Sequence, residues 1–337
     1  MNRALTAVAL SALAILLVAL PLLMPLLKLD ISLGVTVLLF GLAAASVNLL
    51  VGYTRIMAFG NAAFFGLGAY GAALFVQYVM PNFWLAIAVG SAAGLIGALV
   101  LAPFLIRRRG IYFALLTIAF GQVFYFIAYR MTKVTGGEDG MTVTRPALRL
   151  GSWSLGSHES AFYYFVLVLF CAVMLGLWYV VHSPFGRTLV AIGQNEVRVR
   201  YLGLNSDRFI FQALVISGLI AGIAGSLYAM SIEFAYPLLL DWHQSGNFVM
   251  MVILGGSGTF WGPLLGSAIY SIGQNVLSSW THAWQIIIGG LFVACVLLFP
   301  RGILGLSLRP RGADVAREED VYEAPTPRSA AAEAEAP

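Results

Sequence analysis

Residues 31–51, ISLGVTVLLFGLAAASVNLLV, contain no charged side chain. A helix needs about 20 predominantly apolar residues to cross a bilayer. Working outward from this stretch, comparable runs cover Leu5–Leu27, Asn61–Met80, Trp84–Ile106, Ile111–Tyr129, Ala161–Val181 and Phe209–Ile232. Of the 337 residues, 60% are hydrophobic and 10% are charged, and the mean hydropathy is +0.88, so a soluble domain could not bury this much apolar surface. The sequence therefore predicts an all-α polytopic membrane protein.

Arginines in the connections predict the orientation of the spans. Arg107–Arg109 and the segment 183–208 are rich in arginine, so both are expected in the cytoplasm. The loop 131–160 balances basic against acidic residues, and one predicted span separates it from each of those connections. We therefore expect this loop to lie outside the cell membrane. Glycines four residues apart inside spans, such as Gly218 and Gly222, predict close helix packing.

The region 248–299 is too long for a single span. The arginine-containing tail after it is expected inside and the connection 233–244 outside, so an odd number of crossings must separate them. We expect a short segment to about Leu254, a glycine-rich break at 255–259, a second segment to about Ser279, and a last span from Trp284 to Phe299.

These segments give about ten transmembrane segments, including short and broken helices, with both termini in the cytoplasm. Residues 1–302 form the transmembrane domain, and Leu5–Leu27 is expected to be an uncleaved first span. Residues 303–337 are rich in Ala, Glu, Pro and Arg, a composition that cannot bury a core. They are expected to form a disordered cytoplasmic tail.

The chain shows no energy source of its own. Its fifteen Asp and Glu residues lie in connections, at span ends or in the tail, whereas proton-coupled carriers need a protonatable group at membrane depth. A phosphate-binding loop needs Gly-Lys, but the only lysines, Lys28 and Lys133, follow Leu and Thr. The GxGxxG match at Gly66–Gly71 lacks a preceding strand. We expect no ATPase site, catalytic residue, cofactor or metal site here; if ATP drives the protein, a partner binds it. Sodium coupling through carbonyls at a helix break stays open.

The cytoplasmic segment 183–207 carries helix-capping signals. Ser183 followed by Pro184 is typical of a helix start, and Gly203 suits a left-handed stop. We expect one helix from Pro184 to Leu202, bent at Gly193, with residues 205–207 capping the next span. Such a helix is either a solvated connection on the membrane surface or a docking element for a cytoplasmic partner.

Several motifs in chain order resemble one transporter family. They are SPFGR at 183–187 with Asn195-Glu196 and Gly203-Leu204-Asn205, GIYFALLT at 110–117, TGGEDG at 135–140, LGGSGTFWGP at 254–263 and FPRG at 299–302. Together they make the chain similar to the M-type permease subunit of branched-chain amino acid ABC importers. The family usually has two small residues where this chain has Arg198 and Val199.

The resemblance implies a bacterial inner-membrane permease that forms half of a translocation path. Its implied partners are a second, related permease, two cytoplasmic ATP-binding subunits and a periplasmic solute-binding protein. The implied ATPase-coupling residues are Ser183, Pro184, Gly186, Arg187, Asn195, Glu196 and Gly203. Gly136, Gly137, Glu138 and Asp139, on the external loop, are candidates for contact with the binding protein.

Amide side chains inside spans are costly unless they are paired or face a polar channel. Asn48, Asn61, Gln122 and Asn275 are therefore candidates for the translocation path, with hydrogen bonding between helices as the alternative. The break at Gly255, Gly256, Ser257 and Gly258 is a further candidate, because freed backbone groups need partners at that depth; a tight turn between packed helices is its alternative.

Other functions stay open. Gly255-Gly256-Ser257-Gly258 also matches the nucleophile motif of intramembrane serine proteases, although a serine nucleophile needs a histidine within hydrogen-bond reach. A passive channel would work without partners. The resemblance covers permeases for urea and short amides as well as aliphatic amino acids, and no residue in the spans identifies the solute.

Overall fold

The computed structural model describes residues 30–146, 149–150, 153–154, 159–281, 283–299 and 302–304. The predicted span Leu5–Leu27 and nearly all of the predicted tail lie outside the described residues. The elements are α2 (Ile31–Asn48), η2 (Leu49–Tyr53), α3 (Asn61–Tyr78), α4 (Phe83–Leu105), α5 (Ile111–Arg130), α6 (Thr132–Thr135), η3 (Gly137–Asp139), β1 (Met141–Thr142), β2 (Arg149–Leu150), β3 (Trp153–Ser154), α7 (Glu159–His182), α8 (Pro184–Gln194), α9 (Glu196–Tyr201), α10 (Ser206–Ile232), β4 (Phe234–Ala235), η4 (Pro237–Leu240), α11 (Trp242–Gly255), α12 (Gly262–Trp280) and α13 (Trp284–Leu298).

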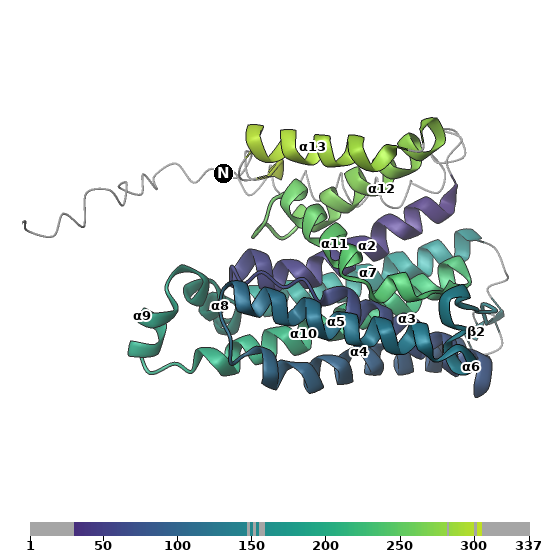
Figure 1. Ribbon diagram of the computed structural model, residues 1–337, viewed down its shortest axis with the longest axis horizontal. Coiled ribbons are helices and arrows are strands. Elements are labelled where there is room, and N and C mark those ends of the chain that lie inside the picture. The colour runs from purple at the N-terminus through teal and green to yellow at the C-terminus, as the bar shows by residue number, and fades with distance from the viewer. Residues whose placement is uncertain are drawn as a thin grey trace, which may run out of the picture.

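The long helices form a bundle, as the sequence predicts (Figure 1). Within the described residues, five helical segments are long and apolar enough to cross a membrane: Ile31–Tyr53, Phe83–Leu105, Ile111–Arg130, Ser160–His182 and Ser206–Ile232. α13 is a shorter apolar helix. The predicted division of 248–299 is also confirmed, because α11, α12 and α13 follow one another with a break after Gly255. The chain is therefore an all-α membrane protein.

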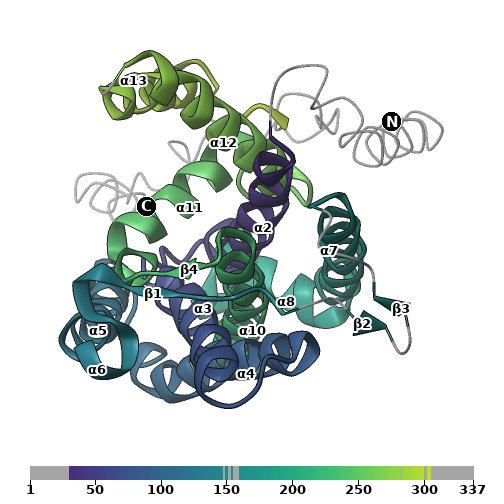
Figure 2. The same ribbon diagram turned by 90° about the vertical axis from the view of Figure 1, so that its right-hand side faces the viewer.

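α2 lies at the centre of the bundle and is almost wholly buried. Figure 2 shows it between the α11–α12 pair and the group formed by α3, α10 and α4. The glycine-packing prediction is confirmed where α4 crosses α10, since a Cβ on Gly94 would lie 2.6 Å from the Cα of Gly222. Backbones that approach this closely gain packing contacts that lipid cannot supply.

The two ends of the bundle differ. α8 and α9 project at one end, and α6 with the β1–β4 pair lies at the other (Figure 1). The connection 233–244 was expected on the external side of the membrane. Its β4 pairs with β1, which belongs to the loop expected on that same side, and its η4 turn packs against α3 and α5. The cause is the apolar sequence PLLL, in which Leu239 and Leu240 are 1% and 2% exposed. η4 therefore anchors this connection to the bundle.

Candidate functional site

The α8–α9 segment is built from three capping residues. Ser183 Oγ accepts a hydrogen bond from the N–H of Gly186 at 3.4 Å, and Pro184 is the first residue of α8. Gly203 has φ +83°, the left-handed conformation expected of a helix stop. Asn205 Oδ1 accepts from the N–H of Asp207 at 3.1 Å at the start of α10. All three predicted caps are confirmed.

The prediction of one helix bent at Gly193 is wrong. α8 ends at Gln194, and Asn195 adopts an extended conformation with φ −158°. Its Oδ1 accepts the N–H of Arg198 at 2.9 Å and starts α9. Asparagine competes with the helix by binding backbone N–H groups, so the break falls at the capping residue.

Glu196 is the centre of an ionic network that holds α9 against the bundle. Arg109 Nε lies 2.9 Å from Glu196 Oε2 and Arg109 Nη2 lies 2.9 Å from Oε1, a bidentate pair. Arg200 Nη2 donates to Glu196 Oε1 at 2.7 Å. Arg109 also pairs with Asp207, the second residue of α10. The network joins the α4–α5 connection to α9 and α10.

Electrostatics and burial both favour this network. Partial burial by itself raises the pKa of Glu196, but hydrogen bonds and charge attraction from Arg109 and Arg200 outweigh it and hold the pKa below its ordinary value. The side chains of Arg109 and Glu196 are only 28% and 23% exposed. A bidentate, half-buried network contributes more to the free energy of folding than an isolated ion pair on the surface.

The last turn of α8 contacts η2, the turn that follows the C-terminal end of α2. A Cβ on Gly193 would lie 2.6 Å from the carbonyl oxygen of Tyr53 in η2, so only glycine permits this approach. η2 is a π-helical turn, a form of helix common at functional sites. The ring of Phe185 in α8 also stacks on Phe209 in α10, with centroids 5.8 Å apart.

Asn48, the last residue of α2, links the α2–η2 segment to the turn between α11 and α12. Its Nδ2 donates to the carbonyl of Thr259 at 2.9 Å, and its Oδ1 accepts the N–H of Gly258 at 2.9 Å. Gly302 packs against Gly256 of this turn. The N–H of Ile303 donates a hydrogen bond to the carbonyl of Leu254 at 3.2 Å. α8, η2 and the turn at 255–259 are thus in continuous contact at one end of the bundle.

The outward face of α9 carries residues that the sequence analysis did not select. Val197, Tyr201 and Leu202 are 61%, 87% and 74% exposed. Arg198 is exposed between them, whereas Val199 is buried and anchors the helix. Of the predicted coupling residues, Ser183, Asn195 and Glu196 stabilise the segment, and Arg187 is exposed on α8. The sequence does carry a signal that could have identified this face: large apolar residues alternate with arginines between the two capping residues Asn195 and Gly203.

Besides Asn48, two more of the four amides predicted for the translocation path form hydrogen bonds between segments of the bundle. They are Asn61 and Gln122. Asn61 Nδ2 donates to Ser217 Oγ at 2.6 Å and Ser46 Oγ at 3.2 Å, and Asn61 is 1% exposed. Gln122 Nε2 in α5 donates to Asp241 Oδ2 at 3.1 Å. These contacts fit the alternative interpretation, hydrogen bonding between helices.

The break at 255–258 is a tight turn next to η2. Gly255 and Gly256 are buried, and Ser257 is exposed. His243, near the start of α11, is separated from Ser257 by nearly the full length of that helix, about 20 Å at 1.5 Å per residue. No hydrogen bond joins Ser257 to a histidine within the described residues.

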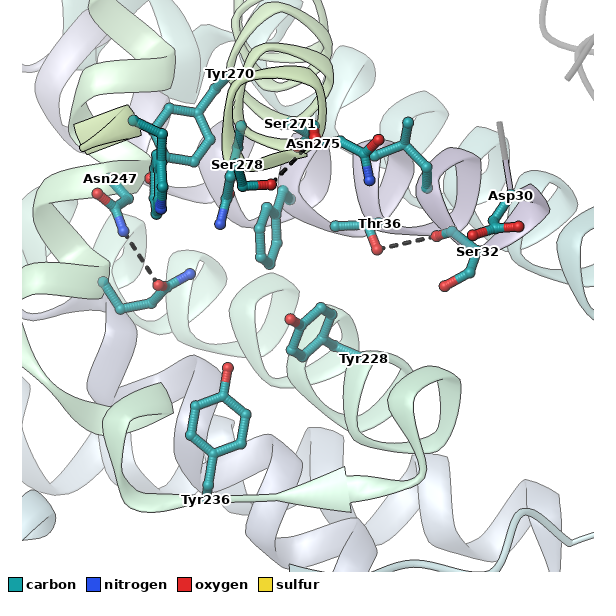
Figure 3. Close-up of a pocket in the computed structure, with 15 residues that line it drawn as sticks. Asp30, Ser32, Thr36, Tyr228, Tyr236, Asn247, Tyr270, Ser271, Asn275 and Ser278 are labelled. Atoms are coloured by element: carbon teal, nitrogen blue, oxygen red, sulfur yellow. Dashed lines mark hydrogen bonds between the residues drawn. The ribbon is translucent and has the colours of Figure 1, made fainter. Parts of the chain in front are cut away.

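Asn275 lies elsewhere, on the wall of a polar cavity of about 330 Å³ between α2, α10, α11 and α12 (Figure 3). Residues from the first half of α2 and the last half of α12 line it, so it opens at the end of the bundle opposite α8. Four polar residues of α12 reach it, spaced i, i+3, i+4 and i+7: Ser271, Gln274, Asn275 and Ser278. This spacing places them on one helix face. The sequence analysis selected Asn275 and missed the stripe.

The candidate binding-protein loop is anchored to the bundle at the cavity end. Gly136 and Gly137 both have positive φ, and Glu138 accepts a hydrogen bond from the hydroxyl of Tyr129 at 2.9 Å. β1 pairs with β4. Arg145 donates to the carbonyl of Met230 at 2.9 Å and lies 4.5 Å from the ring centroid of Phe162. Glu138 and Asp139 are therefore exposed on a supported turn, whereas Gly136 is half-buried and Gly137 is buried.

A bundle of apolar helices that encloses a polar cavity and carries a charged helix pair at one end defines a membrane transport permease. The comparisons with known proteins identify which kind. The chain belongs to the family of permease components of the branched-chain amino acid transport system, whose family profile matches residues 31–296.

The chain is similar to two kinds of permease from this family. It is 26% identical over 303 residues to the high-affinity branched-chain amino acid transport system permease protein LivM of Salmonella typhimurium, covering 84% of this chain and 71% of that protein. LivM of Escherichia coli is 27% identical over 285 residues, 78% and 67% of the two chains. LivH of Salmonella typhimurium is 24% identical over 285 residues, 79% and 91% of the two chains. No solved structure matches the chain.

Proposed function

We propose that this chain is the M-type permease subunit of an ABC importer for branched-chain or related amino acids. It forms half of the translocation path in the bacterial inner membrane, and a second, related permease forms the other half. The family match and the similarity to both LivM and LivH support a pair of permeases. Urea or short amides on the same scaffold are the alternative substrates.

The observation that carries this proposal is the outward face of α9. Val197, Tyr201 and Leu202 expose large apolar surface on a segment that is rich in arginine. Exposed apolar and aromatic residues with arginine are typical of protein interfaces. The occupant we assign is a cytoplasmic ATP-binding subunit, because the described residues contain no phosphate-binding loop and the family resemblance implies such a subunit at this segment.

Motion reaches the spans along two routes. The first is the ionic network from Glu196 through Arg109 to the α4–α5 connection and through Asp207 to α10. The second is the contact of Gly193 with η2, and from there through Asn48 to the α11–α12 turn. When the ATP-binding subunits approach each other, both routes move as one body with α8 and α9, and the permease alternates its opening.

The proposed topology has ten spans with both termini in the cytoplasm. The α8–α9 segment and Arg107–Arg109 lie at the same end, which supports a cytoplasmic location by the distribution of basic residues. The loop 131–146 then faces the periplasm, where the solute-binding protein docks on the turn at 136–139. The cavity opens on that same side.

Replacing Tyr201 and Leu202 by alanine tests the proposal. We expect affinity for the ATP-binding subunits that co-purify with the chain to fall at least tenfold, the loss typical of removing interface anchors. The matched control is Tyr179→Ala on α7, where the tyrosine is 63% exposed on an apolar span. Equal affinity of the double variant and the parent protein, measured in detergent or nanodiscs, would contradict the assignment.

A further inference from the structure

The cavity between α2, α10, α11 and α12 has the size of a small-molecule site, about 330 Å³. Polar groups enter it from all four helices. Figure 3 shows Tyr228 and Tyr236 directing their hydroxyl groups toward the same space, with Asn247 and the α12 stripe across from them. Its lining consists of Asp30, Ser32, Leu33, Thr36, Phe40, Tyr228, Tyr236, Gln244, Asn247, Tyr270, Ser271, Gln274, Asn275, Ser278 and Trp284.

One polar atom in this wall lacks a partner. Ser271 is 3% exposed, and its Oγ has no hydrogen-bond partner within the described part of the chain. Leaving a buried hydroxyl unpaired costs free energy, so such groups are rare outside functional sites. The Oγ itself has almost no accessible surface, so the unpaired hydroxyl lies behind the cavity surface.

The back wall is rigid. The ring of Tyr228 packs against Phe40 and Phe65, with centroids 5.1 and 5.5 Å away, and Phe248 packs on both phenylalanines at 5.7 and 5.2 Å. This cluster fixes the tyrosine hydroxyl before any solute arrives. A preformed site loses little conformational entropy on binding.

The charge of the lining is unusual for an amino acid site. Among the lining residues that the structure describes, Asp30, at the mouth, is the only charged side chain, and none is basic. A carboxylate in the cavity must therefore be bound by neutral donors, namely amide N–H groups and hydroxyls. An ammonium group is attracted by Asp30 and can donate hydrogen bonds to the hydroxyl groups of Tyr228 and Tyr236. An anionic solute would be desolvated without a compensating cation, which is costly.

We propose that this cavity is the transit site for the solute within this subunit, and that it accepts small zwitterionic or neutral solutes and rejects anionic ones. This inference rests on the proposed function and adds the location and chemistry of the solute site. Aliphatic side chains fit against Leu33, Phe40 and Trp284, while the α12 stripe and Asn247 bind the polar end. The selectivity comes from the lack of a cation among the described lining residues and is independent of the binding protein.

The experiment uses the full importer and a cysteine placed in the wall. The chain contains two cysteines, Cys171 and Cys295, which are replaced by alanine before Asn275→Cys is introduced. Ser279→Cys is the matched control, since Ser279 is exposed on the same helix but is absent from the lining. We expect millimolar L-leucine to slow labelling of Asn275→Cys at least twofold and to leave Ser279→Cys unchanged; L-glutamate should protect neither. A cationic methanethiosulfonate reagent should label Asn275→Cys faster than an anionic one, because Asp30 is the nearest lining charge.

Two results separate this inference from the proposed function. ATP-driven leucine uptake by the cysteine-free parent without protection of Asn275→Cys, or with equal protection by glutamate, overturns the cavity assignment alone. Absence of ATP-driven uptake of any amino acid or short amide by the unmodified importer overturns the proposed function and the cavity assignment together. If the cysteine-free chain does not assemble, Asn275→Leu and Ser279→Leu are compared in the native sequence. Uptake at least tenfold lower for Asn275→Leu alone is the expected result, and equal uptake by the two variants contradicts the assignment.

Discussion

The α8–α9 end and the cavity end use polar residues in opposite ways. At the α8–α9 end, Glu196 and Asp207 are paired with Arg109 and Arg200. The described part of the cavity lining has many hydroxyl and amide groups but one charged side chain, Asp30. Fixed ion pairs hold elements together, which suits a segment that must transmit motion. Neutral groups bind a solute weakly enough to release it, which suits a transport path.

The largest expected effect comes from reversing one charge in the network. Arg109→Glu places two carboxylates together at Glu196 and leaves Asp207 with only its longer contact to Arg200 at 3.6 Å, so α9 should detach from the α4–α5 connection. We expect ATP-driven uptake to fall more than tenfold while membrane insertion is unaffected. The measurement is uptake into proteoliposomes containing the full importer.

The control for this prediction is the double exchange Arg109→Glu with Glu196→Arg, which restores opposite charges at the 2.9 Å contact. Partial recovery of uptake by the double variant identifies the pair as the coupling element. If either single variant takes up solute as fast as the parent protein, the network has no part in coupling. The functional difference drawn between the two ends of the bundle would then be wrong.

Breaking the contact between α8 and η2 should have the next largest effect. A leucine at Gly193 cannot fit where a Cβ would lie 2.6 Å from the carbonyl of Tyr53. We expect Gly193→Leu to lower uptake about tenfold and to leave ATP hydrolysis by the bound subunits in place, because the outward face of α9 is intact. Gly246→Leu is the control, since a Cβ there meets no atom within 4 Å. If ATP hydrolysis by the bound subunits falls as much as solute uptake, the variant impairs assembly of the importer and not coupling.

A stability effect is expected at Asn48. Asn48→Leu removes both hydrogen bonds to the 255–259 turn, so the N–H of Gly258 and the carbonyl of Thr259 lose their side-chain partner. Each lost hydrogen bond costs about 0.5–1.5 kcal/mol, so the thermal midpoint of the detergent-solubilised protein should fall by a few degrees. An unchanged midpoint would mean that water satisfies the turn and that Asn48 faces a hydrated path.

The smallest effect is expected at Ser257. Ser257→Ala leaves the backbone of the turn unchanged, and the serine is exposed, so uptake should stay within about twofold of the parent. The variant also tests the protease hypothesis. Loss of a peptide-cleaving activity with unaltered uptake would establish a nucleophile at this position.

The sequence predicted most of the helices and their ends, because apolar run length and capping residues act locally. Ser183, Gly203 and Asn205 cap or stop helices where expected. The break at Asn195 was missed because asparagine fits both a helix interior and a cap, and tertiary contacts decide between them. The inward packing of η4 was missed for a similar reason, since a connection between spans gives no local signal of its depth.

Long-range pairings were beyond the sequence analysis. Arg109 and Glu196 are 87 residues apart, and Asn48 and Thr259 are 211 apart. Their contact depends on how the helices pack. The α12 stripe is different, because Ser271, Gln274, Asn275 and Ser278 carry a visible helical period in the sequence. Only the bundle shows that this face meets Tyr228 across a cavity.

Reconstitution of ATP-driven uptake tests the central claim most directly. The chain and its partner permease are placed in proteoliposomes with the solute-binding protein, with and without the ATP-binding subunits, and accumulation of radiolabelled L-leucine is measured. The account predicts accumulation only when the ATP-binding subunits and ATP are both present, and no flux through the two permeases alone. Leucine accumulation or rapid leucine flux in the absence of those subunits would contradict it.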